Sequence, residues 1–387
     1  MRDDVDTFSS VSFVPKETGT PAVTGERPHQ QSHYVSATPA SAPVLKGLSP
    51  SSFPGMSAIR SHIVEVIRNH AVSFIRLEMA RRVHSVLDTK SDAENIVPDI
   101  ECLSETGKLE SVIIGFPDNM MLGGHREIIN ATQEKNLNNG LMPTPNETVA
   151  EFVDFKRVLE ANGVNVLMPN YVDVQEQIYT RDIGFVIGKT FFVSGMAKAA
   201  RKPEVAGIQH TIAGFSPENV IHIPEGMTIE GGDVIVDRGV VYIGVGQRTE
   251  GKAVDFMCEA LKDSGLKVEP IYIKQPYEGE DSLHLDCTFM PVGEGYALIY
   301  PDAMRNIPQS IRNNYIWIIV NREEQENLET NVLSLSPTKV LSRSSSVRLN
   351  EEMRKAGIEV IELKFDQAPI NGGSFRCCSL PLKRSNF

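Results

Sequence analysis

The chain has 387 residues, of which 41% are hydrophobic and 23% are charged, and its formal net charge is -12. A chain of this length and composition can bury the cores of one large or two ordinary globular domains. The acidic balance argues against a nucleic-acid surface or an anionic membrane surface, because both require clustered Lys and Arg. No apolar run approaches the roughly 20 residues that cross a bilayer. We therefore expect a cytoplasmic protein with no nucleic-acid partner and no membrane partner, whose field favours a small cationic ligand.

The first 106 residues differ in texture from the rest. Residues 1–56 are rich in Ser, Pro, Thr and Gly and carry few large apolar side chains, which predicts a disordered tail. Residues 57–87 place apolar side chains largely at helical spacings, which predicts a long or broken amphipathic helix. With the linker that follows, it forms a helical extension over residues 57–106. This extension packs either on its own domain or against a partner, so a homodimer stays open.

Residues 107–387 are predicted to form one domain built from repeats. Three amphipathic helical patterns each end near a glycine that suits a left-handed helix cap, and a short β-rich stretch follows each of them. These glycines are Gly163, Gly265 and Gly357. They lie 102 and 92 residues apart, so units of about 50 residues leave room for further copies between them. In the second helix, a spacing of i, i+3, i+4 and i+7 assigns Cys258 to the core face.

Hairpins separate these helical segments. The stretches "DVIVDRGVVYIGV", "CTFMPVGEGYALIYP" and "NVLSLSPTKVLS" each place turn residues between two runs of β-formers. The unit is therefore a hairpin, a helix and a strand, repeated about five times. This pattern predicts an α/β fold class in which the repeats close into a fivefold α/β propeller.

Polar residues concentrate beside strands in four stretches: "IYTRDIGFVIG", "IEGGDVIV", "HLDCTF" and "NGGSFRCC". His284 and Asp286 are two residues apart on a predicted strand, so their side chains share a face. Glu230 and Asp233 flank a glycine pair, where the missing side chains let a ligand or another backbone approach.

The carboxylates in these stretches stand where a β-rich pattern would prefer Val or Ile. Unpaired burial of charge is costly, so these carboxylates require a cation. They are Asp182, Glu230, Asp233 and Asp286. A guanidinium is planar and has five N–H donors, so it can satisfy two or three carboxylates at once. A nearby cysteine could attack its central carbon while His284 manages the protons.

The four stretches, in this order, resemble those of the guanidino-group-modifying enzymes of the pentein superfamily, especially arginine deiminases and dimethylarginine dimethylaminohydrolases, and more distantly glycine amidinotransferases. The resemblance covers roughly residues 108–387. It implies a fivefold propeller of ββαβ-type units that acts on a small cationic guanidino substrate and needs no metal or organic cofactor. Residues 107–387 would then be the catalytic domain.

The resemblance also implies roles for individual residues. The catalytic residues would be Cys377 as nucleophile, His284 and Glu230. The substrate-binding residues would be Asp182, Asp286, Tyr179, Arg201, Arg248 and Asp233. In the family, arginines at the positions of Arg201 and Arg248 fix the substrate carboxylate. A further family arginine has no equivalent where this chain reads "QAPINGG", so the carboxylate end of the substrate stays open.

The implied reaction is hydrolysis of the guanidinium carbon through a covalent amidino intermediate on cysteine. It would release ammonia or an alkylamine and leave a ureido product such as citrulline. An amidinotransferase is the alternative, because "GKLESVIIGFPDN" resembles the opening strand of those enzymes, although "EGGD" is the hydrolase form. A metal-dependent amidinohydrolase with Asp, Glu and His ligands is a weaker alternative, since a second His ligand is missing.

The chain also places two cysteines side by side near its C-terminus. On a strand, successive side chains point to opposite faces, so Cys377 and Cys378 cannot both enter one site. Cys377 matches the family's nucleophile, and Cys378 is predicted to be a packing thiol.

Overall fold

The computed structural model describes residues 78, 81, 99–117 and 127–385. The predicted tail over residues 1–56 lies outside this range, and of the predicted helix over residues 57–87 only Glu78 and Arg81 are described, both helical. Across the described residues, no helix is both long and apolar enough to cross a membrane.

The described residues form five sheets of three strands each. Their strands, in sheet order, are β15 (Ser379–Ser385), β1 (Lys108–Ile114) and β2 (Asn165–Leu167); β3 (Gly184–Ile187), β4 (Thr190–Val193) and β5 (Val220–His222); β6 (Val234–Asp237), β7 (Val240–Val245) and β8 (Lys267–Tyr272); β9 (Phe289–Val292), β10 (Tyr296–Ile299) and β11 (Ile316–Ile319); and β12 (Leu333–Ser336), β13 (Lys339–Arg343) and β14 (Glu359–Leu363).

Four of the five sheets follow the predicted unit, and the first differs from it only in lacking the hairpin. In each sheet the central strand pairs antiparallel with one neighbour, through a hairpin in four of the five sheets, and parallel with the other. The parallel partner requires a long crossover, which helical segments supply. In the hairpin between β6 and β7, Arg238 and Gly239 both have positive φ (50° and 76°), as a tight two-residue turn requires. No ladder joins one described sheet to another.

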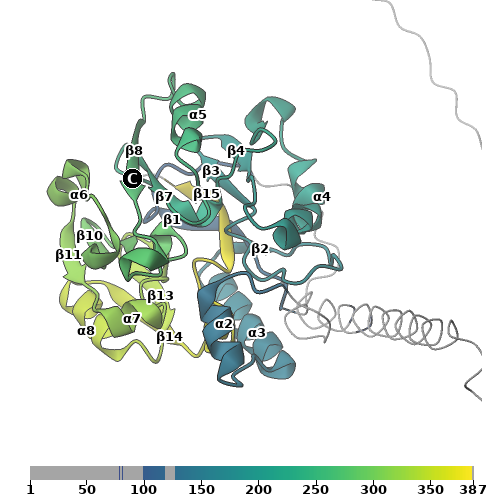
Figure 1. Ribbon diagram of the computed structural model, residues 1–387, viewed down its shortest axis with the longest axis vertical. Coiled ribbons are helices and arrows are strands. Elements are labelled where there is room, and N and C mark those ends of the chain that lie inside the picture. The colour runs from purple at the N-terminus through teal and green to yellow at the C-terminus, as the bar shows by residue number, and fades with distance from the viewer. Residues whose placement is uncertain (1–77, 79–80, 82–98, 118–126, 386–387) are drawn as a thin grey trace, which may run out of the picture. The chain divides into compact units, whose positions relative to one another are not determined.

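Helical segments occupy the crossovers and the connections between units (Figure 1). The α-helices are α2 (Ala131–Asn138), α3 (Pro145–Ala161), α4 (Gln209–Ile212), α5 (Lys252–Ala260), α6 (Gln309–Asn314), α7 (Arg322–Glu326), α8 (Val347–Lys355) and α9 (Gln367–Ile370). The 3-10 segments are η2 (Ala199–Ile208), η3 (Pro217–Asn219), η4 (Gly231–Asp233), η5 (Pro276–Glu278), η6 (Leu285–Cys287) and η7 (Pro301–Ala303).

Two helix ends agree with the sequence and one does not. Gly163 follows α3 and Gly357 follows α8, with φ of 78° and 81°. In contrast, α5 ends at Ala260, and a turn separates it from Gly265. Cys258 is exposed, so its assignment to the core face is wrong. The helix buries Ala253 and Met257 instead, a stripe narrower than the apolar spacing suggested.

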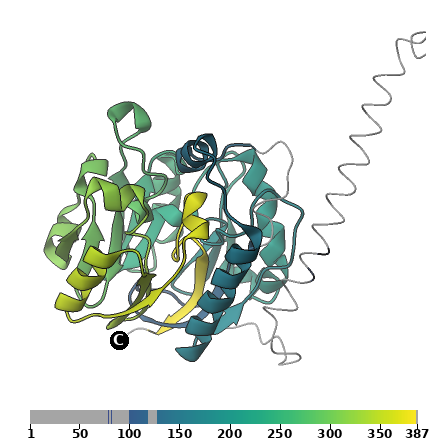
Figure 2. The same ribbon diagram turned by 90° about the horizontal axis from the view of Figure 1, so that it is seen from below.

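The first sheet joins the two ends of the described domain. Strand β15 pairs antiparallel with β1, from Lys108 opposite Ser385 to Ile114 opposite Ser379. Figure 2 shows this C-terminal strand, in yellow, between α3 on one side and α8 on the other. Because the chain completes its first sheet with its last strand, the residues just before β15 are held against residues from the beginning of the domain.

Burial falls across each sheet from its first strand to its third. Strands β3, β6 and β9 are buried along their whole length, whereas β5, β11 and β14 are largely exposed or half-buried. The hairpin strands that open the units are therefore the inner ones. Any turn that immediately precedes such a strand lies toward the interior.

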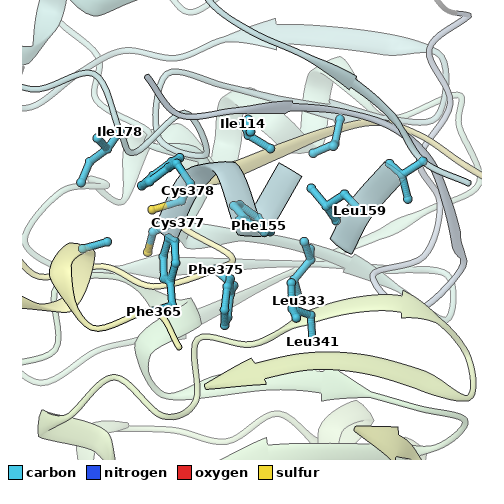
Figure 3. Packing of buried hydrophobic residues seen from close by; sticks show 14 of the residues in the cluster. Ile114, Phe155, Leu159, Ile178, Leu333, Leu341, Phe365, Phe375, Cys377 and Cys378 are labelled. Carbon is cyan, nitrogen blue, oxygen red and sulfur yellow. The ribbon is translucent and has the colours of Figure 1, made fainter. Parts of the chain in front are cut away.

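A hydrophobic cluster packs α3 against the residues that precede β15. Phe365 and Phe375 stack with ring centroids 4.4 Å apart, and Phe155 of α3 lies 5.5 and 5.2 Å from them. Figure 3 shows Cys377 and Cys378 at one end of this cluster. The position of the two cysteines therefore depends on aromatic packing.

We expect Phe155→Ala to lower the free energy of unfolding by about 3–5 kcal/mol, because it removes a fully buried ring from three aromatic contacts. Denaturant unfolding of the full chain measures the loss. The matched control is Tyr277→Ala, whose ring is 82% exposed and which should change stability by less than about 0.5 kcal/mol. Equal losses in both variants would contradict the packing role.

Candidate active site

The four polar stretches each form a turn directly before a strand. Asp182 lies in the turn before β3, η4 precedes β6, η6 precedes β9, and residues 375–378 form the turn before β15. His284 and Asp286 are therefore not on a strand, as the sequence predicted, but at the start and inside of a 3-10 turn. Cys377 and Cys378 likewise lie in a turn, so strand alternation does not separate them.

These turns are hydrogen bonded to one another in a ring. Gly231 N donates to Asp182 O at 3.2 Å, and Leu285 N donates to Asp233 Oδ1 at 2.8 Å. The ring continues when Thr330 Oγ1 donates to Cys287 O at 2.9 Å, and it passes to the last turn through Cys377 N, which donates to Asn331 Oδ1 at 3.0 Å. Arg181 N then donates to Cys377 O at 3.1 Å. We call these five segments the turn ring; it gathers one segment from each sheet.

Cys377 lies beside the Asp286 carboxylate. Its Sγ is 3.6 Å from Asp286 Oδ2, and its side chain is 3% exposed. Burial raises the pKa of the Cys377 thiol well above its usual range, and the charges of Asp286 and Asp182 raise it further. Cys378 is fully buried among hydrophobic side chains. The thiol nearer to the polar groups is therefore a neutral S–H at neutral pH.

His284 is held between two carboxylates. Its Nε2 forms a 2.9 Å hydrogen bond with Glu230 Oε2, and its Nδ1 lies 3.7 Å from Asp182 Oδ1. Burial lowers the pKa of His284, but Asp182, Asp233 and Glu230 outweigh it and raise this pKa to about 9. For the Glu230 carboxyl, burial acts in the opposite direction and raises the pKa, but His284 and Arg248 lower it to about 2. At neutral pH the pair is an imidazolium and a carboxylate.

Arginines pair with two of the site carboxylates. Arg201 Nη1 donates to Asp182 Oδ2 at 2.6 Å, and its Nε and Nη2 donate to Glu204 at 2.9 and 2.8 Å. Arg248 Nη1 lies 3.2 Å from Glu230 Oε2, and its Nη2 donates to Ile129 O. Both predicted arginines thus reach the site, where they contact the acids that were expected to hold the guanidinium.

Asp286 also has its own arginine. Arg376 Nη1 donates to Asp286 Oδ2 at 2.9 Å, and its Nε and Nη2 contact Glu105 at 3.1 and 3.2 Å. Asp286 Oδ1 accepts only the Cys287 thiol, at 3.5 Å, among the contacts of the described residues. Likewise, Asp182 Oδ1 is buried and has no hydrogen-bond partner within the described part of the chain. Two carboxylate oxygens therefore remain able to accept N–H donors.

The glycine pairs permit this close packing. A Cβ on Gly232 would lie 2.7 Å from the His284 ring and 2.8 Å from Asp182 Oδ1. A Cβ on Gly373 would lie 2.3 Å from the Tyr179 ring. Tyr179 itself donates from its OH to Ala368 O at 2.8 Å. The structure thus brings every predicted site residue into one region, with Tyr179 as a buried wall.

Asp233 has a supporting position. Its Oδ1 accepts the Leu285 N–H, and burial raises the pKa of Asp233 to about 7. A Cβ on Gly244 would lie 2.5 Å from the same Oδ1. Asp233 therefore orients the turn that carries His284.

Sequence reasoning missed Asn331 and the role of Arg376. Asn331 Oδ1 accepts the N–H groups of Ser374 and Cys377, so this side chain fixes the turn that carries Cys377. Its signal was its place in the repeat, since "TN" stands before β12 as "RD" stands before β3. Arg376 was visible as the residue before Cys377, but its pairing with Glu105 joins residues 271 apart and had no local signal.

Asp182, Glu230 and His284 could also hold a metal ion by geometry, since each offers a ligand atom within 4.8 Å of the others. The charges of the site work against this reading. Both carboxylates already contact an arginine, and His284 has a pKa of about 9, so a metal would have to displace its proton. The donor set suits a cation that donates hydrogen bonds better than a metal ion.

Relatives at the sequence level cover most of the domain. The family model described as "N,N dimethylarginine dimethylhydrolase, eukaryotic" matches residues 116–384. The uncharacterized protein YkgA of Bacillus subtilis (strain 168) is 34% identical over 288 residues, which cover 73% of this chain and 95% of that protein. An arginine deiminase of Listeria welshimeri is 26% identical over 57% of this chain, and the match spans 64% of the deiminase.

Solved structures share the fold. DDAH from Pseudomonas aeruginosa, as a mutant complexed with citrulline, gives a TM-score of 0.59 at 18% identity, over 71% of this chain and 99% of that chain. SxtG, an amidinotransferase from Microseira wollei, gives a TM-score of 0.59 at 19% identity, over 75% of this chain and 98% of that chain. The family model covers most of the domain, and a DDAH and an amidinotransferase share its fold. The chain therefore belongs to the pentein superfamily, in the family described as "N,N dimethylarginine dimethylhydrolase, eukaryotic".

Proposed function

We propose that this protein hydrolyses the guanidinium carbon of arginine or an arginine derivative through a covalent amidino intermediate on Cys377. The observation that carries the proposal is the thiol of Cys377 beside Asp286, in one buried region with Asp182 and the His284–Glu230 pair. The family and the deiminase relative support hydrolysis of a guanidino group. We also propose that the five sheets close into a fivefold propeller, which the turn ring supports.

The substrate guanidinium would lie between the two carboxylates that each have an oxygen able to accept a further hydrogen bond. Asp182 Oδ1 and Asp286 Oδ1 would each accept N–H groups from it, which places its central carbon near Cys377 Sγ. Arg201 and Arg248 remain the proposed contacts for a substrate carboxylate. Because they also pair with Asp182 and Glu230, this contact would require them to share their donors.

The reaction would proceed in two halves. Cys377 as thiolate attacks the guanidinium carbon, the bond from that carbon to the leaving nitrogen breaks, and His284 donates a proton to the departing ammonia or amine. His284, now neutral, then takes a proton from water as this water attacks the thiouronium carbon. The C–S bond breaks, and a ureido product and the free thiol remain.

The thiolate would form only with substrate in place. In the free enzyme, burial and the carboxylates keep the pKa of Cys377 well above its usual range. A guanidinium between Asp182 and Asp286 would neutralise the charges that oppose the thiolate, which lowers this pKa again. The nucleophile would thus be protected from other electrophiles until substrate binds.

An amidinotransferase stays the second candidate, because an amine could replace water as acceptor and a solved amidinotransferase shares the fold. Incubation of the full chain with arginine and methylated arginines, with and without glycine or lysine, decides between them. We expect a ureido product and ammonia or a methylamine whether or not an amine acceptor is present. Formation of ornithine together with an amidinated amine would contradict the hydrolase proposal.

We expect Cys377→Ser to reduce kcat by at least about 10³-fold, since serine is a far weaker nucleophile at this position. Cys378→Ser should retain most of the activity, because this thiol packs in the hydrophobic cluster. Steady-state product formation measures both, and circular dichroism checks folding. Loss of activity in Cys378→Ser alone, with a folded protein, would reverse the assignment.

The pH dependence of kcat/KM should show a rise that levels off near pH 9. In the state that attacks the substrate, Cys377 and His284 share one proton. In the free enzyme at neutral pH they hold two, because Cys377 is a thiol and His284 is an imidazolium. The imidazolium loses its proton first, since the pKa of His284 is about 9. Below that pKa, kcat/KM should rise about tenfold per pH unit. Glu230→Gln removes a charge that raises the pKa of His284, so the plateau should begin at lower pH.

The control for this shift is Asp237→Asn. Asp237 is also a buried carboxylate, but it accepts hydrogen bonds from Ser104 and Tyr315 and contacts no proposed catalytic group. Its variant should keep the wild-type pH profile. If the plateau of Glu230→Gln begins at the same or a higher pH than in the wild type, Glu230 does not tune the proton of His284.

A further inference from the structure

A small cavity lies next to the turn ring, with two arginines in its wall. Its volume is about 20 Å³, and its lining includes Arg181, Arg384, Glu105 and Cys102 together with apolar side chains of β3, β6 and β15. Arg181 and Arg384 are 5% and 2% exposed. This cavity shares no lining residue with the proposed catalytic and substrate-binding groups.

Two arginine nitrogens in the wall of the cavity have no hydrogen-bond partner among the described residues. Arg384 Nη1 donates to the carbonyls of Gly107 and Ser334 at 2.7 and 2.8 Å. Arg181 Nε donates to Arg376 O at 3.4 Å. The Nη2 atoms of Arg181 and Arg384 are buried and have no hydrogen-bond partner in the described residues. Both side chains line the cavity, which is where such donors would find an acceptor.

The charges around the cavity do not balance. Arg181, Arg376 and Arg384 form a group of three guanidiniums, and each of the other two raises the electrostatic cost of charging Arg181. The opposing carboxylates are Glu105 and Asp286. Arg376 contacts both of them, while Arg181 Nη2 lies 3.7 Å from Glu105 Oε1, within ion-pair distance but too far for a hydrogen bond. Within the described part of the chain, Arg384 has no carboxylate within ion-pair distance.

Other groups nearby do not supply the missing negative charge. Asp237 pairs with Arg238, whose Nε lies 3.7 Å away. Cys102 lines the cavity, but burial raises the pKa of its thiol to about 12, so it is neutral. A buried guanidinium cannot shed its proton at physiological pH, and an unpaired buried charge is strongly destabilising. Glu105 and Asp237 act on Arg384 only from beyond ion-pair distance, so the surroundings of Arg384 favour one further negative charge.

We propose that this cavity binds one monatomic anion of the size of chloride, held by the Nη2 groups of Arg181 and Arg384. One water-sized particle needs a cavity of roughly 10–15 Å³, so a volume of about 20 Å³ suits a single small ion better than a polyatomic anion such as sulfate or phosphate. The Glu105 carboxylate also lines the cavity, and its double contact with Arg376 offsets its repulsion of an anion.

The anion would stabilise the turn ring through Arg181. The backbone N–H of Arg181 holds the carbonyl of Cys377, and its side chain holds the carbonyl of Arg376. An ion that fixes the Arg181 side chain therefore fixes the turn that carries the proposed nucleophile. The proposal concerns charge balance in the fold and does not depend on the reaction proposed above.

Thermal unfolding of the full chain tests the proposal. Protein exchanged into methanesulfonate, an anion too large for the cavity, is titrated with chloride at constant ionic strength. We expect the melting temperature to rise by about 2 °C at tenfold the dissociation constant and to follow a single-site binding curve. A melting temperature that is independent of chloride, or that rises equally with sulfate, would overturn the proposal.

Variants show where the ion acts. Arg384→Met removes the unpaired charge with a side chain of similar length, and we expect it to abolish the response to chloride. Arg157→Met is the matched control, because Arg157 is an exposed arginine paired with Asp154 on α3; it should keep the full response. A chloride response that persists in folded Arg384→Met would contradict the site.

Bromide provides a direct readout on the wild-type chain and does not depend on any variant being folded. Crystals grown in bromide should give an anomalous difference peak between Arg181 and Arg384. A peak at that position supports the proposal. Ordered density there without anomalous signal would mean that a water molecule fills the cavity, and the proposal would fall.

Discussion

The pairing of three site carboxylates with buried arginines is the constraint on which the rest of this structure depends. The pairs are Asp182 with Arg201, Glu230 with Arg248, and Asp286 with Arg376, at 2.6, 3.2 and 2.9 Å. Removing one member of such a pair leaves an uncompensated buried charge, at a cost of about 3–5 kcal/mol. Each pair gives a buried acid a counter-charge within the protein, and Asp182 and Asp286 each keep one oxygen that could accept an N–H donor from a cationic ligand.

The fold makes these pairs possible by bringing turns rather than strands together. Each inner strand is preceded by a short polar turn, and hydrogen bonds between successive turns pass from one sheet to the next until the last reaches the first. Strand β15 completes this arrangement by pairing with β1, which holds Cys377 against a turn almost 200 residues earlier. The site is therefore a property of the whole domain and not of any one unit.

The sequence predicted the repeat unit and the hairpins, because these follow from local periodicity. It also singled out polar residues beside strands that the structure brings into one region, while their roles stay predictions. It failed where tertiary contacts decide. "HLD" alternates like a strand, but Asp233 captures the backbone of Leu285 and holds the segment as a turn. Cys258 was assigned to the core face from only four apolar positions on a short helix, which are too few to define the buried face. The contact of Glu105 with Arg376 joins the two ends of the domain, and no local pattern marks it.

In the proposed reaction, the electrostatics of the site couple substrate binding to reactivity. A thiol whose pKa is raised by burial and by neighbouring acids is a poor nucleophile, while an imidazolium between two carboxylates is a reluctant acid. Burial and the charge of Asp286 oppose the thiolate, while Glu230 and Asp233 hold the proton on His284. Asp182 contributes to both effects. A planar cation bound to Asp182 and Asp286 would offset part of this negative charge, so the contact proposed to select a guanidinium would also favour the thiolate and the release of the proton from His284. Specificity and activation would then be a single event, and a neutral ligand of the same shape would bind without being attacked.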